Sequence, residues 1–198
     1  MKKPFFEELQ VLKKTVDTIY SLPENDWDAF AACWQRLSIG KQQTLTVAGS
    51  VERNLYFVIE GTQRIFSLDD KDREATLLFT YPPSFGGVID SLFMQKPSRY
   101  YFETLSASVL LVLPYNKFIT LMEESKAINT FVAKSLIMSL SGLLERLTEL
   151  QSLSSEEKFK KLLQRSPHIL QLIPQKYLAN YIGIDATNFS KLMNKVKI

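Results

Sequence analysis

The side chains that most often carry metal or redox chemistry are nearly missing from this sequence. Its 198 residues include one cysteine, Cys33, and one histidine, His168. A single cysteine cannot close an intrachain disulfide or hold a cluster that needs several thiolates of one chain. A single histidine excludes multi-histidine metal sites and argues against a Ser-His triad. We therefore expect no metal, no cofactor and no enzymatic activity.

Positive charge is concentrated in the last part of the chain. Residues 154–198 hold eight lysines and arginines against three carboxylates, a net charge of +5, whereas the rest of the chain carries −2. A small basic segment on a slightly acidic body indicates a polyanion partner. A solvated helical surface would give the same charge, so charge alone does not decide between the two.

The same segment has the residue pattern of a helix-turn-helix. Two helices are predicted, over 175–182 and from 186 to about 195, with Asp185 as the cap of the second. The motif needs a small residue where the helices cross, here Ala179, and tolerance of positive φ in the turn, here Gly183. Its five apolar positions are filled by Leu178, Ile182, Ile184, Phe189 and Leu192. An ordinary helical hairpin with a glycine turn is the alternative.

The outward side of the second helix would then enter the major groove of double-stranded DNA. Asn pairs with adenine edges, Lys reaches guanine or phosphate, and Thr contacts bases or a thymine methyl group. The predicted contacts on this helix are Ala186, Thr187, Asn188, Ser190, Lys191 and Asn194. Lys176, Lys195 and Lys197 are better placed for phosphates, which give affinity without base readout.

Three kinds of element must position these residues. Residues 5–37 are expected to be helical, interrupted by Pro23. From about residue 44, short runs rich in β-branched and aromatic residues alternate with turn residues, as in a sandwich or barrel. The break at 82–87, with two prolines and two glycines, cannot be a regular central strand. From Asn116 the periodicity is helical, and Ser154 with Glu157 predicts a capping box.

Leucines in this helical region predict a dimer. Their spacing of four, three, four and three residues is the a/d pattern of a coiled coil, formed by Leu136, Leu140, Leu143, Leu147 and Leu150. A β domain covers only one side of a long helix, so pairing with a second copy is favoured over packing in a core. The longest uncharged run in the second half, Ser135–Leu144, is far short of the roughly 20 residues of a membrane span, and the N-terminus lacks the longer apolar core of a secretory signal. We expect a soluble, cytoplasmic protein without a membrane partner.

The order of these elements resembles the Crp/Fnr family of transcription regulators over essentially the whole chain. The resemblance is carried by residues 55–61 with Arg64, by 85–87, by 97–101 and by the terminal motif. It is closest to short members common in Bacteroidetes-type bacteria. It implies an α+β fold, with a cyclic-nucleotide-binding-like sensor domain (a double-stranded β-helix, or jelly roll) at 1–118, a dimerisation helix at 119–152 and a helix-turn-helix domain at 153–198. It also implies a homodimer on palindromic DNA.

An effector site in the β-roll, for a small anionic molecule, is a further implication of the resemblance. Nucleotide-binding members hold the ligand with a Gly-Glu pair after a Phe and with a nearby Arg; here Val88 replaces the Glu. The implied effector-binding residues are Phe85, Gly86, Gly87, Val88, Arg99 and Tyr100. Without the Glu, cyclic AMP is not the expected effector, and Cys33 and His168 cannot supply the cluster or haem ligands of other branches.

The resemblance is incomplete at the C-terminal end. Only Asn194–Ile198 follow Met193, too few for the β-hairpin wing of the family. The expected function is a homodimeric, sequence-specific transcription regulator with an unknown effector. Two other classes stay open: a ligand-binding β-roll protein whose truncated C-terminal domain mediates protein contacts, and an enzyme on a cupin-like roll, for which residues 44–113 offer no histidine.

Overall fold

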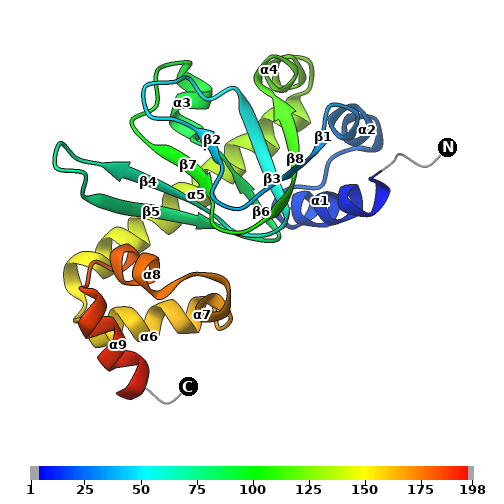
Figure 1. Ribbon diagram of the computed structural model, residues 1–198. Helices are drawn as coiled ribbons and strands as arrows, with labels where there is room; N and C mark the ends of the chain where they lie inside the picture. Colours follow the sequence, from blue (N-terminus) through cyan, green and yellow to red (C-terminus); the bar gives the residue numbers. More distant parts are fainter. Residues whose placement is uncertain (1–4, 196–198) are drawn as a thin grey trace. The chain divides into compact units, whose positions relative to one another are not determined.

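The computed structural model describes residues 5–195, which form two compact units (Figure 1). One unit comprises residues 1–65 with 79–138, and the other comprises 66–78 with 139–198, as far as these residues are described. Two elements pass from one unit to the other: the long helix α5 (Lys126–Ser152) and the hairpin of β4 (Gln63–Leu68) and β5 (Glu74–Thr80). The division therefore differs from the three domains expected from the sequence, because α5 is shared between the units.

The N-terminal helices follow the sequence pattern only in part. Helix α1 (Phe6–Ile19) and helix α2 (Glu24–Ala32) are separated by Pro23, as expected. Helix α2 ends at Ala32, short of the predicted residue 37, and β1 (Gln35–Ile39) follows directly. The sequence analysis missed β1 because its five residues do not alternate clearly between polar and apolar.

The β-roll consists of two four-stranded sheets. The first has the order β1-β8-β3-β6 and the second β2-β7-β4-β5. The pairs β1–β8, β2–β7, β3–β6 and β3–β8 are antiparallel. The remaining strands are β2 (Thr44–Thr46), β3 (Asn54–Glu60), β6 (Ser84–Gly86), β7 (Tyr101–Thr104) and β8 (Ser108–Pro114). Strand β6 lies within the segment rich in proline and glycine and occupies an edge, as its composition requires.

Two short helices lie outside the predicted pattern. Helix α3 (Ile89–Met94) follows β6, and α7 (Ile169–Leu172) follows α6. Each spans fewer than two turns, too few for a helical period to be visible in the sequence. The remaining helices are α4 (Tyr115–Glu124), α6 (Ser155–Arg165), α8 (Gln175–Tyr181) and α9 (Ala186–Lys195).

Aromatic rings form the centre of the β-roll unit. The ring of Phe131, from the first part of α5, lies 6.0 Å from that of Phe30 on α2 and 5.9 Å from that of Phe85 on β6. Phe57 on β3 contacts Phe85 at 5.1 Å. Tilted and edge-on ring pairs at these distances add about 0.5–1.5 kcal/mol each to the gain from burial. This cluster fixes the first turns of α5 against the roll.

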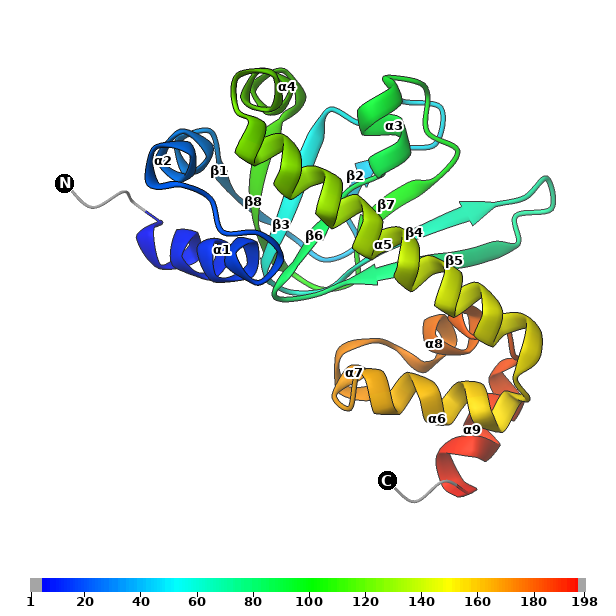
Figure 2. The ribbon, with the colours of Figure 1, turned by 180° about the vertical axis from the view of Figure 1, so that it is seen from behind.

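Large apolar side chains are exposed along the middle turns of α5, the long helix that Figure 2 shows from behind. Large apolar residues from Leu136 to Leu147 are exposed, with Leu140 at 56% and Leu147 at 50%. An 18-residue window of this helix has a mean hydropathy of 1.4, so by length and composition it could cross a membrane. The expectation of no membrane-spanning segment rested on the length of uncharged runs, and charged residues interrupt the apolar runs of α5. The start of the same helix is buried in the β-roll unit at Ile128, Phe131 and Val132.

Two glycines with positive φ give a matched test of packing against backbone strain. Gly61 has φ +84°, and a Cβ there would meet the carbonyl oxygen of Ala107 and the side chain of Ser108 well inside van der Waals distance. Gly49 has φ +89° but nothing within 4 Å of such a Cβ. We expect Gly49→Ala to lower the free energy of unfolding by about 1 kcal/mol, and Gly61→Ala by roughly 3 kcal/mol. Urea unfolding of both variants measures this; equal losses would contradict the collision at Gly61.

Candidate functional site

The C-terminal helices are held together by a small apolar core. Helix α6 begins at a capping box, in which the Ser154 side chain accepts from the Glu157 amide and the Glu157 carboxylate accepts from the Ser154 amide, confirming the sequence prediction. The buried face of α6 carries Phe159, Leu162 and Leu163. The Phe159 ring meets the ring of Phe189 on α9 edge-on at 5.2 Å. One side of α9 is therefore fixed against α6.

Helices α8 and α9 are joined by the tight turn that the sequence predicts. Gly183 has φ +68°, a conformation that favours glycine. The Ile184 amide donates to the Ala179 carbonyl at 3.0 Å, and the Asn188 amide donates to the Asp185 carboxylate at 2.8 Å, which caps α9. Four of the five predicted apolar residues are buried and Ile184 is half-buried.

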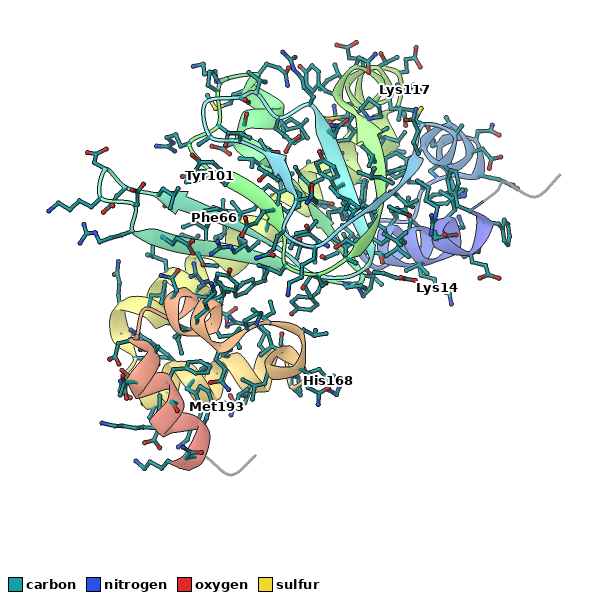
Figure 3. The ribbon with its side chains drawn as sticks, viewed as in Figure 1. Lys14, Phe66, Tyr101, Lys117, His168 and Met193 are labelled. Carbon is teal, nitrogen blue, oxygen red and sulfur yellow. The ribbon has the colours of Figure 1, made fainter. Side chains whose placement is uncertain are left out.

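The predicted DNA contacts lie mainly on the free side of α9. Ala186, Thr187, Ser190, Lys191 and Asn194 are exposed, whereas Asn188 is half-buried. Lys176 is exposed at the start of α8, with its ammonium 4.4 Å from the ring centroid of Tyr177. Figure 3 labels Met193 on α9 and His168 in the turn after α6; His168 is exposed.

Lys195, another predicted contact, has a carboxylate partner. Its ammonium lies 2.8 Å from the Glu156 carboxylate, which also binds Lys160 at 2.8 Å. Hydrogen bonds to these two lysines lower the pKa of Glu156 to about 2. The remaining predicted phosphate contact, Lys197, lies outside the described residues, as does most of the segment in which a wing was expected to be missing.

The predicted dimer residues are placed differently along α5. Leu136, Leu140, Leu143 and Leu147 are exposed, together with Ile137, Met138 and Leu144 beside them. Leu150 is half-buried. Its Cδ2 atom lies 3.9 Å from the position that a Cβ atom would occupy at Gly183. Leu150 thus packs at the turn between α8 and α9 of its own chain.

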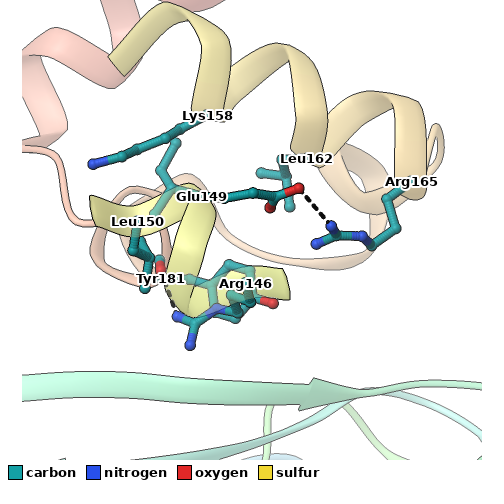
Figure 4. Close-up of a pocket in the computed structure, with 8 residues that line it drawn as sticks. Arg146, Glu149, Leu150, Lys158, Leu162, Arg165 and Tyr181 are labelled. Carbon is teal, nitrogen blue, oxygen red and sulfur yellow. Dashed lines mark hydrogen bonds and ion pairs between the residues drawn. The ribbon is translucent and has the colours of Figure 1, made fainter. Parts of the chain in front are cut away.

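Leu150 also lines a small enclosed hollow between α5, α6 and α8 (Figure 4). Arg146, Lys158, Arg165 and Tyr181 lie around it, and Arg165 is paired with Glu149 at 2.8 Å. The Arg146 guanidinium lies 3.9 Å from the ring centroid of Tyr181 and donates to the Tyr181 carbonyl at 2.7 Å. The hollow has a volume of about 20 Å³, which is enough for a single water molecule and too small for an organic ligand.

The residues implied for the effector site differ in burial. Gly86, Gly87 and Val88 are buried, and a Cβ on Gly87 would lie 3.2 Å from the Asn54 carbonyl and 3.3 Å from the Tyr56 ring. Phe85 belongs to the aromatic core described above. Arg99 is exposed, with its guanidinium 5.5 Å from the ring of its neighbour Tyr100. The loop is therefore packed directly against β3, and the arginine lies outside.

A carboxylate that the sequence analysis did not single out lies beside this loop. Glu52 is 2% exposed and accepts hydrogen bonds from the Thr46 hydroxyl, from the Arg53 and Asn54 amides, and from the Val88 amide at 3.4 Å. Burial raises the pKa of Glu52 in spite of these donors. Burial and the nearby Glu52 together raise the pKa of Tyr56. Glu52 links segments that are far apart in the sequence. A local residue pattern therefore could not identify it as a buried hydrogen-bond acceptor.

A second buried charge is balanced by an ion pair. The Arg64 guanidinium, on β4, lies 2.6 Å from the Glu103 carboxylate on β7. Across residues 5–195, no group of three His, Cys, Asp or Glu side chains is placed to hold a metal ion. The buried charged side chains Glu52 and Arg64 are thus each hydrogen-bonded or ion-paired.

Comparison with known proteins identifies a matching domain family and similar solved structures. Residues 36–125 match the family model of the cyclic nucleotide-binding domain. No curated protein matches the sequence significantly. FixK2 from Bradyrhizobium japonicum is similar in structure with a TM-score of 0.73, at 13% identity over 82% of this chain and 83% of that one. The regulator CLP from Xanthomonas campestris gives 0.61, at 19% identity over 87% and 91%.

A third similar structure is the catabolite activator protein of Thermus thermophilus, with a TM-score of 0.55 at 22% identity over 88% of this chain and 83% of that one. The similar structures include a transcriptional regulator described as a member of the Crp/Fnr family. At identities below 25%, all of these likenesses show a shared fold alone. The likeness to short Bacteroidetes-type members stays a prediction. The chain therefore has the fold of the Crp/Fnr transcription regulators, built on a β-roll that matches the cyclic nucleotide-binding domain family at residues 36–125.

Proposed function

We propose that the protein is a homodimeric, sequence-specific DNA-binding transcription regulator. The observation that carries the proposal is α9: one face is fixed by an apolar core, and the other presents Thr187, Lys191 and Asn194 to solvent. These residues follow at intervals of four and three, so they form one row along the helix. A helix held in this way can enter the major groove without rearranging.

The chemistry of this row suits base edges, and its surroundings suit phosphates. Asn194 can pair with adenine, and Lys191 can donate to guanine acceptors. Lys176 at the start of α8 provides a phosphate contact that fixes the register without reading sequence. In a symmetric dimer, the two half-sites would be centred about 10 base pairs apart.

The exposed stripe on α5 supports dimerisation with a second copy of the chain. Seven large apolar side chains between Leu136 and Leu147 are exposed, an arrangement uncommon on a monomer surface. The a/d spacing of the leucines fits an identical helix packed alongside. Covering the stripe in this way would account for the apolar composition of α5.

The β-roll is proposed to work without a cyclic nucleotide. In the resemblance to nucleotide-binding members, loop amides and an arginine hold the phosphate. Here the Val88 amide already donates to Glu52, and Arg99 points away into solvent. A phosphate at this loop would meet the buried carboxylate of Glu52. This supports a regulator whose β-roll takes either no effector or one of different chemistry.

One experiment tests this proposal as a whole. The purified protein is used to select genomic DNA fragments with and without cyclic nucleotides. We expect a palindromic site to be recovered. Adding cyclic nucleotides should not change which fragments are selected. Recovery of no DNA would favour the alternative, a ligand-binding β-roll protein whose C-terminal domain mediates protein contacts.

Lys191→Ala tests base readout. We expect the affinity for the selected operator to fall about tenfold, with a smaller loss on random DNA, because a base contact is worth about 1–3 kcal/mol. Fluorescence anisotropy on both DNAs measures this. Lys117→Ala, on exposed α4, is the matched control. Equal losses on both DNAs would reduce Lys191 to a phosphate contact.

Leu147→Glu tests the dimer stripe. Placing a charge in an apolar seam should raise the dimer dissociation constant about a hundredfold or more, and light scattering should then report a halved mass. Met94→Glu changes a residue that is 60% exposed on α3 and should leave the mass unchanged. A Leu147→Glu protein that keeps the wild-type mass refutes this interface.

Glu52→Gln tests the buried carboxylate through pH. Because the folded-state pKa is raised, the folded protein binds a proton more readily than the unfolded chain, so Glu52 destabilises the fold increasingly as the pH rises above 4.5. The stability of the variant relative to wild type should therefore increase from pH 4.5 toward neutral pH. Urea unfolding at several pH values measures the difference. Glu60→Gln, at an exposed position, controls for loss of one charge. A difference independent of pH would contradict the assignment.

A further inference from the structure

The edge of β5 at Glu74–Thr76 is bound by a side chain of α8. The Asn180 amide group donates to the Glu74 carbonyl at 2.8 Å, and its oxygen accepts from the Thr76 amide at 2.6 Å. Strand β5 is the last strand of its sheet, so these backbone groups face away from the neighbouring strand β4. A single side-chain amide thus satisfies both groups, as an additional strand would.

Arg146 of α5 strengthens the same junction. Its guanidinium donates to the Tyr181 carbonyl at 2.7 Å and approaches the Thr76 carbonyl at 3.5 Å. Thr76 is only 3% exposed, so its hydrogen bonds are shielded from water. The edge of β5, the end of α8 and the later part of α5 therefore form one hydrogen-bonded group within the C-terminal unit.

The other end of β5 is fixed by different contacts. Beyond Leu78 the strand belongs to the β-roll unit, where the Thr80 hydroxyl donates to the buried side chain of Gln63 at 2.8 Å. A β-strand is stiff along its length compared with a loop. The same strand thus carries a polar anchor in the β-roll and a second one on α8.

We propose that Asn180 is a positioning residue for the DNA-reading helices, acting through the β5 edge. The β4–β5 hairpin is then a second connection, beside α5, between the β-roll and these helices. The DNA-reading role rests on the proposed function. In a dimer, the benefit of binding two half-sites together requires both α9 helices to be held at a fixed spacing. Loss of the Asn180 contacts should reduce that benefit and leave each helix able to bind alone.

Hydrogen exchange tests the contact itself and needs no DNA. In Asn180→Ala, exchange of the Thr76 amide should accelerate about tenfold, the equivalent of one net hydrogen bond. The amides of Leu178 and Ile182, within the helical core, should keep their protection. Asn180→Asp, which retains only an acceptor, should give an intermediate rate. Asn129→Ala, on an exposed turn of α5, is the matched control. Unchanged Thr76 exchange in Asn180→Ala overturns the proposal.

DNA binding tests the positioning role. For Asn180→Ala, affinity for the full palindromic site should fall about tenfold, while affinity for a single half-site stays at the wild-type value. Equal losses on both DNAs would mean that Asn180 only stabilises the fold, and would overturn the positioning role. If the wild-type protein binds no DNA, the proposed function fails, and the exchange measurement still decides whether Asn180 holds β5.

Discussion

The packing of Phe131 against Phe30 and Phe85 is the contact on which the other features of the molecule depend. It fixes the start of α5 to the β-roll, and α5 then carries both the apolar stripe and Arg146. Phe85 lies in the segment that the family resemblance assigns to effector recognition. A displacement of that segment would therefore act directly on α5 through ring contacts. In the proposed dimer, this would be a short physical route by which the roll biases α5 between two arrangements.

Elements with a repeating pattern of apolar residues were predicted well, whereas short elements without such a pattern were missed. Helices α8 and α9 lie within a few residues of their predicted bounds, because repeated apolar positions identify them. Gly183 and the capping box also behave as local chemistry predicts. Helices α3 and α7 were missed because each is too short to display a period, and β1 was missed because its residues do not alternate clearly between polar and apolar.

In the candidate site, too, some residues could be predicted from the sequence and others could not. The exposed face of α9 could be predicted because helix geometry and local charge define it. Glu52 and Asn180 could not, because their partners are distant in sequence: Val88 lies 36 residues from Glu52, and Thr76 lies 104 residues from Asn180. The position of Arg99 in solvent likewise depends on the path of a loop, and the family pattern alone does not determine it. Long-range hydrogen bonds, unlike periodic packing, leave no regular spacing in a sequence.

The sharing of Glu156 by Lys160 and Lys195 has a consequence for counterions. A lysine that meets a DNA phosphate displaces a cation condensed on the DNA, and this release makes DNA binding depend on salt. Lys195 instead has a fixed carboxylate as its neutralising partner. Moving it from Glu156 to a phosphate exchanges one exposed ion pair for another, and leaves Glu156 with one lysine fewer. In the proposed DNA complex, Lys195 would therefore add less to the salt sensitivity than a lysine that has no carboxylate partner.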